Sequence, residues 1–383
     1  MCNLPEDKCT GCGTCVASCP FKAISMKEDN EGFLYPYIDH SKCKKCGLCE
    51  KRCPVLKVKK YRKNDFSIYA AYTKNKSILL NSSSGGIFYE LASNVISLGG
   101  IVYGVTYDKI KGAYHIPVDK IENLKNIMGS KYLQANASLV FPKIKEELTQ
   151  GKTILFSGSP CQVAGLKEYL VKDYENLITI DFICTGIPSS KVFKEYIRYW
   201  ENKYNDTFKT IDYRNKQDSW YNYKLKIEFE HKTRYENRFF SPLILLQYNH
   251  FSLRRSCYNC NFRKGNSPSD IELGDFWNVD LVNKEIYNKN GVSCVIIKSD
   301  KGAQLFNKIL NNIKLTQVSE KDLLKVNKSY DNFCMDKEKR DNFFNEFINS
   351  TDRINIIKKY TNYSFKQKFI IKKNLLVLKL KNK

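Results

Sequence analysis

The stretch "CTGCGTCVASCP" at residues 9–20 decides how the first part of this chain folds. A second copy, "CKKCGLCEKRCP", occupies residues 43–54, so that each cysteine and the final proline recur 34 positions later. Both copies follow the pattern C-x2-C-x2-C-x3-C-P. This strict register indicates an internal duplication, which we place within residues 1–57.

The cysteine spacing predicts that residues 1–57 hold two 4Fe-4S clusters. Three thiolates on a tight turn can bind three irons of one cubane, whereas the fourth cysteine points away and binds the other cluster. Each cluster then takes three cysteines from one copy and one from the other. The two predicted ligand sets are Cys9, Cys12, Cys15 and Cys53, and Cys43, Cys46, Cys49 and Cys19. Two zinc sites are the alternative, but zinc ribbons lack the third cysteine and the proline.

The composition is that of a globular protein rich in cysteine and lysine. Of 383 residues, 42% are hydrophobic, and no stretch approaches the 18 apolar residues of a membrane span. The N-terminus has no apolar signal region, so we expect a cytoplasmic protein. Its 15 cysteines are then reduced, and their C-x2-C grouping indicates metal or cluster binding rather than disulfides.

The formal net charge of +23 suits an acidic partner. The lysines are scattered along the chain and no nucleic-acid-binding module matches, so we expect no nucleic-acid partner.

The remainder of the chain alternates between predicted strands and helices. Residues 58–66 are charged and are interpreted as a linker. Residues 67–350 are predicted to form a larger α/β domain with a mixed sheet, because strands such as "TILFSGSP" are followed by amphipathic segments. "YKLKIEFEH" alternates between apolar and polar residues, as a half-exposed antiparallel strand does. The predicted fold class is α+β overall: a small ferredoxin-like two-cluster domain followed by this larger α/β domain.

The last segment, residues 351–383, is basic with interleaved aliphatic residues. A C-terminal helix or tail with a solvated lysine face is the favoured interpretation. Peripheral contact with an anionic membrane surface is the alternative.

Two segments of the larger domain resemble a cofactor site. "NSSSGG" at residues 81–86 precedes a predicted helix, where hydroxyls and glycines form either a phosphate cradle or an ordinary helix cap. "SGSPCQ" at residues 157–162 places Cys161 at the start of another helix, which favours a thiolate.

Cys184 ends the next predicted strand and lies on the same sheet edge as Cys161 if the strands are parallel. A third cluster is one interpretation of these cysteines together with the pair in "SCYNC"; buried thiols and half a zinc site are the others. The four cysteines are Cys161, Cys184, Cys257 and Cys260. Three others have no partner by spacing and are interpreted as packing residues: Cys2, Cys294 and Cys334.

With these segments in view, nearly the whole chain resembles the beta-subunit family of coenzyme F420 (deazaflavin) hydrogenases and dehydrogenases, with a fused two-cluster ferredoxin domain. The segments that carry the resemblance are "SSSGGIFYELA", "GGIVYGVTYD", "GSKYLQAN", "GKTILFSGSPCQVAGLK", "DFICTGIPSS" and "SCYNCNFRKGNSPSDIELGDFW".

The resemblance implies an iron–sulfur flavoprotein with FAD and a third 4Fe-4S cluster. Its implied cluster ligands are Cys161, Cys184, Cys257 and Cys260. The implied flavin-binding residues are Ser83, Ser84, Gly85 and Gly86. Lys131 in "GSKY" becomes a candidate catalytic and cofactor-binding residue, because a fixed positive charge stabilises reduced, anionic flavin.

The chain departs from the family pattern at two positions. Thr185 stands where relatives commonly have histidine, and Asn278 stands where they commonly have glycine. The first departure puts a proton donor at that place in doubt. The acceptor is not inherited from the family either, although relatives that resemble proteins encoded among exopolysaccharide genes fit this chain best.

We therefore expect an oxidoreductase that passes electrons from ferredoxin-type clusters through a flavin to a two-electron acceptor. The expected donor is a reduced ferredoxin or similar carrier, and the expected acceptor is a small molecule or a glycan precursor; the oligomeric state is left open. One alternative is a non-catalytic subunit that relays electrons within a larger redox complex. Another is a structural or regulatory iron–sulfur protein without flavin.

Overall fold

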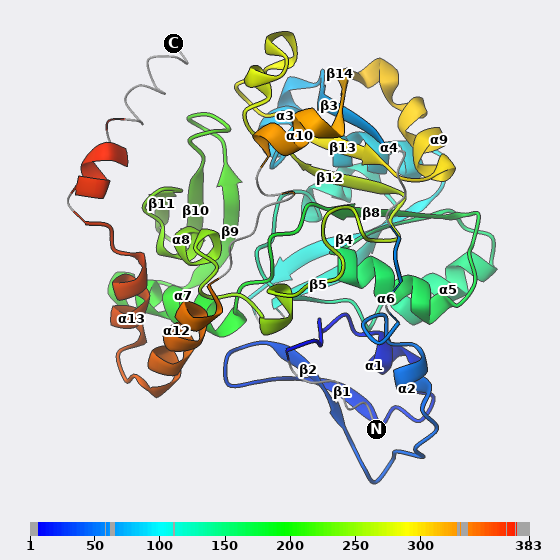
Figure 1. The fold of residues 1–383 in the computed structure, drawn as a ribbon, viewed down its shortest axis with the longest axis horizontal. Coiled ribbons are helices and arrows are strands. Elements are labelled where there is room, and N and C mark those ends of the chain that lie inside the picture. The colour runs from blue at the N-terminus through cyan, green and yellow to red at the C-terminus, as the bar shows by residue number, and fades with distance from the viewer. Residues whose placement is uncertain are drawn as a thin grey trace.

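The computed structural model shows a small N-terminal unit beneath a large mixed sheet, with a second sheet and the C-terminal helices beside it (Figure 1). This arrangement confirms the predicted fold class. The predicted domain boundaries stay predictions, and parts of the predicted linker, with Cys2 and Cys334, lie outside the described residues. The structure describes residues 7–57, 59–61, 66–109, 112–327, 330, 336–364, 366–371 and 373.

The N-terminal unit consists of two one-turn helices and a hairpin. Each helix begins directly after a glycine with a positive φ, Gly13 (86°) and Gly47 (71°), which follows the internal duplication. Glycine suits these positions because L side chains are strained there. The elements are α1 (Thr14–Ser18), β1 (Ile24–Glu28), β2 (Leu34–Ile38) and α2 (Leu48–Lys51). β1 and β2 pair antiparallel.

The large sheet has nine strands in the order β14-β3-β13-β12-β8-β7-β4-β5-β6. The neighbours β12, β8, β7 and β4 run parallel, whereas β14, β3, β13 and β12 pair antiparallel, so the sheet is mixed. β13 is buried along its whole length, as expected of a central strand covered on both faces. The strands are β3 (Ser67–Thr73), β4 (Ile101–Asp108), β5 (Gly112–Val118), β6 (Ala135–Asn136), β7 (Ile154–Ser157), β8 (Leu177–Phe182), β12 (Ile271–Asp275), β13 (Ser293–Ile297) and β14 (Ile313–Val318).

Helices cover both faces of this sheet. Leu155 of β7 packs in one hydrophobic cluster with α4 and α9, whereas its neighbours Ile154 and Phe156 pack in another with α5 and α6. Successive strand residues point to opposite faces, so the two helix pairs lie on opposite sides of the sheet. The helices are α3 (Lys76–Asn81), α4 (Ile87–Ser97), α5 (Phe141–Thr149), α6 (Pro160–Leu170), α9 (Asp300–Lys308) and α10 (Glu320–Val326).

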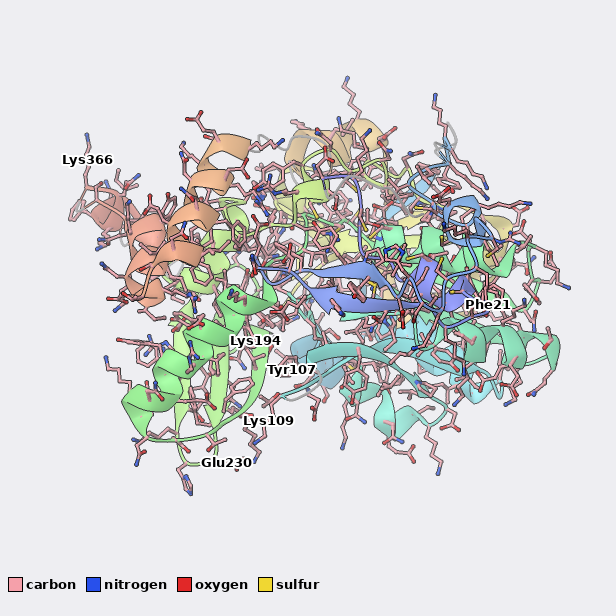
Figure 2. All side chains as sticks on the ribbon, turned by 90° about the horizontal axis from the view of Figure 1, so that it is seen from below. Phe21, Tyr107, Lys109, Lys194, Glu230 and Lys366 are labelled. Carbon is pink, nitrogen blue, oxygen red and sulfur yellow. The ribbon has the colours of Figure 1, made fainter. Side chains whose placement is uncertain are left out.

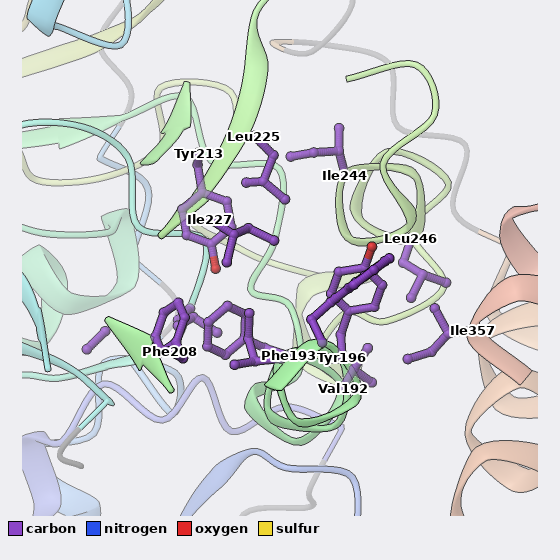
Figure 3. Packing of buried hydrophobic residues seen from close by; sticks show 14 of the residues in the cluster. Val192, Phe193, Tyr196, Phe208, Tyr213, Leu225, Ile227, Ile244, Leu246 and Ile357 are labelled. Carbon is purple, nitrogen blue, oxygen red and sulfur yellow. The ribbon is translucent and has the colours of Figure 1, made fainter. Parts of the chain in front are cut away.

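A three-stranded antiparallel sheet, in the order β11-β10-β9, packs against four helices through an aromatic core (Figure 3). β10 has the predicted alternation: Leu225, Ile227 and Phe229 are buried and the residues between them are partly exposed. The elements are α7 (Ser190–Tyr204), β9 (Phe208–Asn215), β10 (Lys224–Phe229), β11 (Thr233–Asn237), α8 (Pro242–Tyr248), α12 (Lys337–Asn349) and α13 (Arg353–Thr361). Short 3-10 helices are η1 (Ile121–Asn126), η2 (Arg255–Cys257), η3 (Val279–Leu281), η4 (Lys284–Ile286) and η5 (Leu310–Asn312).

The start of the basic C-terminal segment belongs to the packed structure. α13 contacts α7, α8 and α12, and Ile357 is fully buried. Residues 366–371 are helical and lie on the surface, where Lys366 points outward (Figure 2). Within the described ranges, no helix combines the length and the apolar character needed to cross a bilayer.

Candidate functional site

The first predicted ligand set converges on one cavity. Cys9, Cys12, Cys15 and Cys53 all line it. Cys9, Cys12 and Cys53 are buried. Burial raises the pKa of Cys12 to about 11, and burial together with the charge of Cys12 raises the pKa of Cys53 to about 11. Thiolates in such a place require a compensating positive charge, which an iron cluster supplies.

The second predicted ligand set lies nearer the surface. Cys19, Cys43 and Cys49 are half-buried, and Cys46 is exposed. The Cys19 sulfur accepts a hydrogen bond from the Ala23 N–H at 3.4 Å. Among the described residues, no three His, Cys, Asp or Glu side chains are grouped closely enough to hold one metal ion. The cysteine ligands of a cubane bind separate irons, so they are spaced more widely than the ligands of a single ion.

The third set of cysteines also converges. A cavity between the sheet and the η2 loop is lined by Cys161, Cys184, Cys257 and Cys260. The predicted edge placement holds, because β7 and β8 are parallel neighbours and Cys161 and Cys184 follow their carboxyl ends. Burial raises the pKa of Cys184 well above its ordinary value, and the charges of Cys257 and Cys161 raise it further. Burial likewise raises the pKa of Cys260 to about 12.

The first and third cysteine sets lie against each other through α1 and α6. Gly165 of α6 follows Cys161 by one helical turn, and a Cβ added to it would lie 3.2 Å from the Cys12 sulfur. Thr10 lines both cysteine cavities. The two sets are therefore direct neighbours, although Cys12 and Cys161 are 149 positions apart in sequence.

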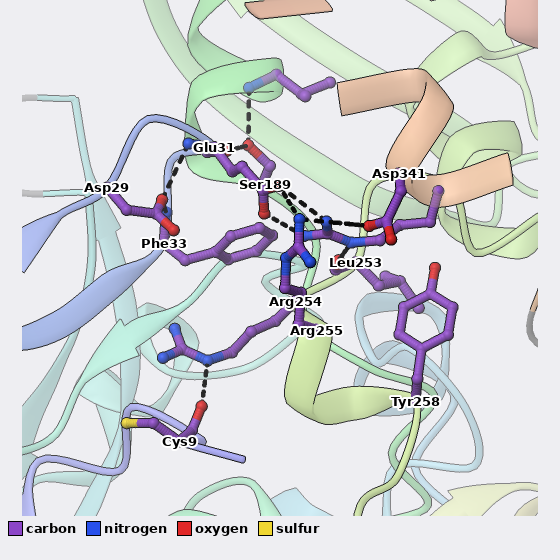
Figure 4. Close-up of polar contacts among 12 residues, drawn as sticks. Cys9, Asp29, Glu31, Phe33, Ser189, Leu253, Arg254, Arg255, Tyr258 and Asp341 are labelled. Atoms are coloured by element: carbon purple, nitrogen blue, oxygen red, sulfur yellow. Dashed lines mark hydrogen bonds and ion pairs between the residues drawn. The ribbon is translucent and has the colours of Figure 1, made fainter. Parts of the chain in front are cut away.

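A buried polar network holds the N-terminal unit in this position (Figure 4). The Arg254 side chain is fully buried; its Nε donates to the Cys9 carbonyl at 2.7 Å and its Nη1 donates to the Leu34 carbonyl at 3.0 Å. Glu31, in the β1–β2 turn, accepts from Arg340 Nη1 at 2.8 Å and from Arg255 Nη2 at 3.3 Å. The hairpin is thus tied both to the η2 loop and to α12.

A larger cavity of about 310 Å³ lies next to the third cysteine set. It lies at the carboxyl ends of the parallel strands β7, β8 and β12, the usual place for a ligand in such sheets. Cys161 and Thr10 line this cavity as well as the cysteine cavity. The three cavities are therefore neighbours that share Thr10 as a lining residue.

Most of the residues that the resemblance implied for flavin face this larger cavity. Ser83, Ser84, Gly86 and Lys131 line it. Gly86 precedes α4 with φ 81° and without a side-chain cap, so no capping side chain competes with a phosphate for the first N–H groups of this helix. Gly85 is not among the lining residues; its N–H donates to the Ser293 hydroxyl at 2.9 Å. A Cβ on Gly85 would lie 2.4 Å from the Ala71 carbonyl oxygen, so here glycine permits close packing.

Lys131 turns its ammonium toward nearby backbone. Nζ donates to the Met128 carbonyl at 2.5 Å and to the Gly129 carbonyl at 3.3 Å. Burial lowers the pKa of Lys131 to about 8, and the charge of Asp212 acts in the opposite direction. The side chain therefore still carries a positive charge at neutral pH.

Two basic residues beside this cavity, Arg214 and Lys216, were missed in the sequence. Arg214 is buried and forms a bidentate ion pair with Asp275 at 2.9 and 3.0 Å. Its Nη2 also donates to the Ser83 carbonyl at 3.0 Å. Lys216 donates to the Ser84 carbonyl at 2.9 Å, and burial lowers its pKa to about 7. The sequence "YRNK" at residues 213–216 was the signal that could have identified them, because it places two basic residues on one face of an extended segment. Strands on a protein surface commonly show the same pattern, so the signal is not specific.

Asn278, one of the two departures from the family pattern, has a structural explanation. Its φ is 55°, in the left-handed region. Asparagine tolerates this conformation better than other L residues, so it can replace glycine without changing the chain path. Thr185 is half-buried between Cys184 and Gly186, and nothing else in the structure explains its identity.

Two family models match parts of this chain. Residues 8–56 match the 4Fe-4S dicluster domain, and residues 151–323 match the C terminus of the beta subunit of coenzyme F420 hydrogenase/dehydrogenase. No curated protein sequence matches the chain. A chain of the F420-reducing NiFe hydrogenase complex from Methanosarcina barkeri has a similar structure, with 18% identity and a TM-score of 0.47 over 74% of this chain and 89% of that chain. The protein thus joins a 4Fe-4S dicluster domain to the C-terminal domain of the coenzyme F420 hydrogenase/dehydrogenase beta-subunit family, as the resemblance predicted.

Proposed function

We propose that this chain is a cytoplasmic iron–sulfur flavoprotein oxidoreductase that moves electrons between the duplicated cysteine motif and a flavin in the 310 Å³ cavity. The observation that carries the proposal is that the three cavities are neighbours with shared lining residues. Thr10 borders both cysteine cavities and the large cavity, and Cys161 borders two of the three. Electron transfer requires redox centres that lie close together, and three isolated cysteine groups would not meet this requirement.

The cysteine sets would hold three 4Fe-4S clusters. The fit is supported by the buried thiols, whose raised pKa values disfavour thiolates unless a positively charged metal is bound. The proposed ligands are the eight cysteines of the duplicated motif in their two crossed sets, together with Cys161, Cys184, Cys257 and Cys260.

The large cavity would hold FAD. Apolar side chains such as Ile127 and Ile183 line it, while the hydroxyls of Ser83 and Ser84 and the start of α4 offer a phosphate site. When bound, flavin exchanges single electrons with clusters and paired electrons with a substrate. Lys131 would contribute a positive charge beside it, and Arg214 would fix the backbone at Ser83.

The proposed donor is a reduced ferredoxin or a similar acidic carrier, because the chain carries a net charge of +23. The proposed acceptor is a small molecule or a glycan precursor. A second candidate function is a non-catalytic subunit that relays electrons within a larger redox complex. It is favoured by the match of residues 151–323 to a domain named for a subunit of hydrogenases and dehydrogenases.

The first experiment measures iron, acid-labile sulfide and flavin per chain in protein purified without oxygen. We expect about twelve irons and one FAD, since each cubane contains four irons. Cys184→Ser should lose about four irons, whereas the matched control Cys294→Ser, at a fully buried cysteine of β13, should lose none. About eight irons without flavin, even after reconstitution, would refute the third cluster and the flavin site. Cluster and flavin reduction without turnover of any two-electron acceptor would favour the relay.

A further inference from the structure

The two copies of the cysteine motif have diverged in charge. Between its cysteines the first copy contains only uncharged residues, "TG", "GT" and "VAS". At the equivalent positions the second copy contains "KK", "GL" and "EKR". The two copies share the same cysteine spacing but differ in charge, which indicates that they face different surroundings.

The first copy is packed against the large domain. A Cβ added to Gly11 would lie 2.2 Å from Gln134 Nε2, and one added to Gly13 would lie 2.8 Å from the Ser138 Cβ. α1 also contacts α5 and α6. This face is therefore already occupied by the chain itself.

The second copy faces solvent at the equivalent positions. Lys45 stands where the first copy has Gly11 and keeps its left-handed backbone, with φ 52° against 67°, but its side chain is exposed. A Cβ added to Gly47, the equivalent of Gly13, would have no described atom within 4 Å. Figure 1 shows α2 on the outer side of α1, away from the large sheet.

The exposed copy is strongly basic around its cysteines. Residues 42–52 contain five cations and one carboxylate, Glu50. The cations are Lys42, Lys44, Lys45, Lys51 and Arg52. Lys42 is partly neutralised by Asp39 at 3.0 Å. Cys46 is exposed among these cations. Phe21 is 42% exposed and comes two residues after Cys19, which belongs to the same predicted ligand set as Cys46 (Figure 2).

We propose that residues 42–52 form the docking surface for a small acidic electron-carrier protein. This inference rests on the proposed function, because it assigns the entry side of the same electron path. Positive charge around an exposed cluster ligand steers an acidic partner to the point where transfer is shortest. One electron leaves the reduced carrier, which is oxidised, and this chain is reduced by one electron; no bond or proton is exchanged.

The test measures the rate at which a reduced, acidic plant-type ferredoxin reduces the cluster-loaded full chain in an anaerobic stopped-flow instrument. The double variant Lys44→Glu with Lys51→Glu reverses two charges on the surface. The control, Lys76→Glu with Lys308→Glu, makes the same change in net charge on α3 and α9, which lie at the other end of the molecule (Figure 1). At low salt we expect at least a roughly 10-fold lower second-order rate constant for the first pair and less than about a 2-fold change for the control.

A second variant guards against misfolding of the loop. Lys45→Gly installs the residue that the first copy has at this position and removes one charge without backbone strain. It should lower the rate several-fold and weaken its salt dependence. An unchanged rate in these variants, or an equal loss in the control pair, would overturn the proposed surface.

Reduced methyl viologen separates this inference from the proposed function. It is a small cation that needs no docking surface, so it should reduce the charge-reversed variants at least as fast as the wild type, with equal iron content. A wild type that methyl viologen reduces but ferredoxin does not would overturn the docking inference alone. A wild type without cluster iron would refute the proposed function and the inference with it.

Discussion

The duplicated motif allows the contact between the N-terminal unit and the large domain to be measured with a matched pair of variants. Gly13→Ala and Gly47→Ala make the same change at equivalent positions, and both place alanine in the left-handed region, at a cost of roughly 1–2 kcal/mol. Only at Gly13 would the new Cβ also overlap a neighbour, at 2.8 Å from the Ser138 Cβ and 3.0 Å from its nitrogen. Such overpacking adds about 1–3 kcal/mol. Gly13→Ala should therefore be about 2 kcal/mol more destabilising than Gly47→Ala, and this difference measures the contact between the N-terminal unit and the large domain.

Hydrogen exchange followed by mass spectrometry on the cluster-loaded protein measures this difference. Local opening governs exchange, and about 2 kcal/mol corresponds to roughly 30-fold. We expect peptides from residues 9–20 and 136–148 to exchange roughly 30-fold faster in Gly13→Ala than in Gly47→Ala. Equal exchange of these peptides in both variants would refute the packing of the first copy against Ser138, in the segment that leads into α5.

Three further predictions concern charged or titrating groups. Arg254→Met removes the donor to the Cys9 carbonyl and should lower the free energy of unfolding by about 2–4 kcal/mol in urea titrations; a loss below about 0.5 kcal/mol would contradict its role. Lys131→Met should lower the midpoint potential of bound flavin by about 20–40 mV in a spectroelectrochemical titration, whereas Lys131→Arg should preserve it. Burial lowers the pKa of His115 to about 4, so the unfolded chain binds more protons between pH 4 and 6.5, and stability falls as the pH drops through this window. His115→Gln should abolish this part of the pH dependence, on the order of 3 kcal/mol, in urea midpoints measured from pH 7 to 4; an unchanged slope would contradict the buried, neutral imidazole.

Local patterns determined the parts of this protein that depend on residues close in sequence. The spacing C-x2-C-x2-C-x3-C-P predicted the duplicated unit, and the apolar alternation around Leu225 and Ile227 predicted a half-exposed antiparallel strand. The strand–helix alternation also predicted that Cys161 and Cys184 share a sheet edge, because parallel neighbours end on the same side. Each of these inferences needs only the periodicity of a single element or the rules for joining two.

Tertiary packing decided the rest. Three cavities share Thr10 as a lining residue, and Arg214 hydrogen-bonds the Ser83 carbonyl from 131 positions away. The first copy of the motif faces the large domain. Each of these features depends on contacts between segments that are distant in sequence. Gly85 shows the limit most clearly: its sequence context resembles a phosphate cradle, but the approach of Ala71 gives it a packing role. No local pattern encodes such contacts, because they depend on how whole sheets and helices are stacked. The sequence also does not distinguish a glycine that faces a ligand from one that packs against a neighbouring strand.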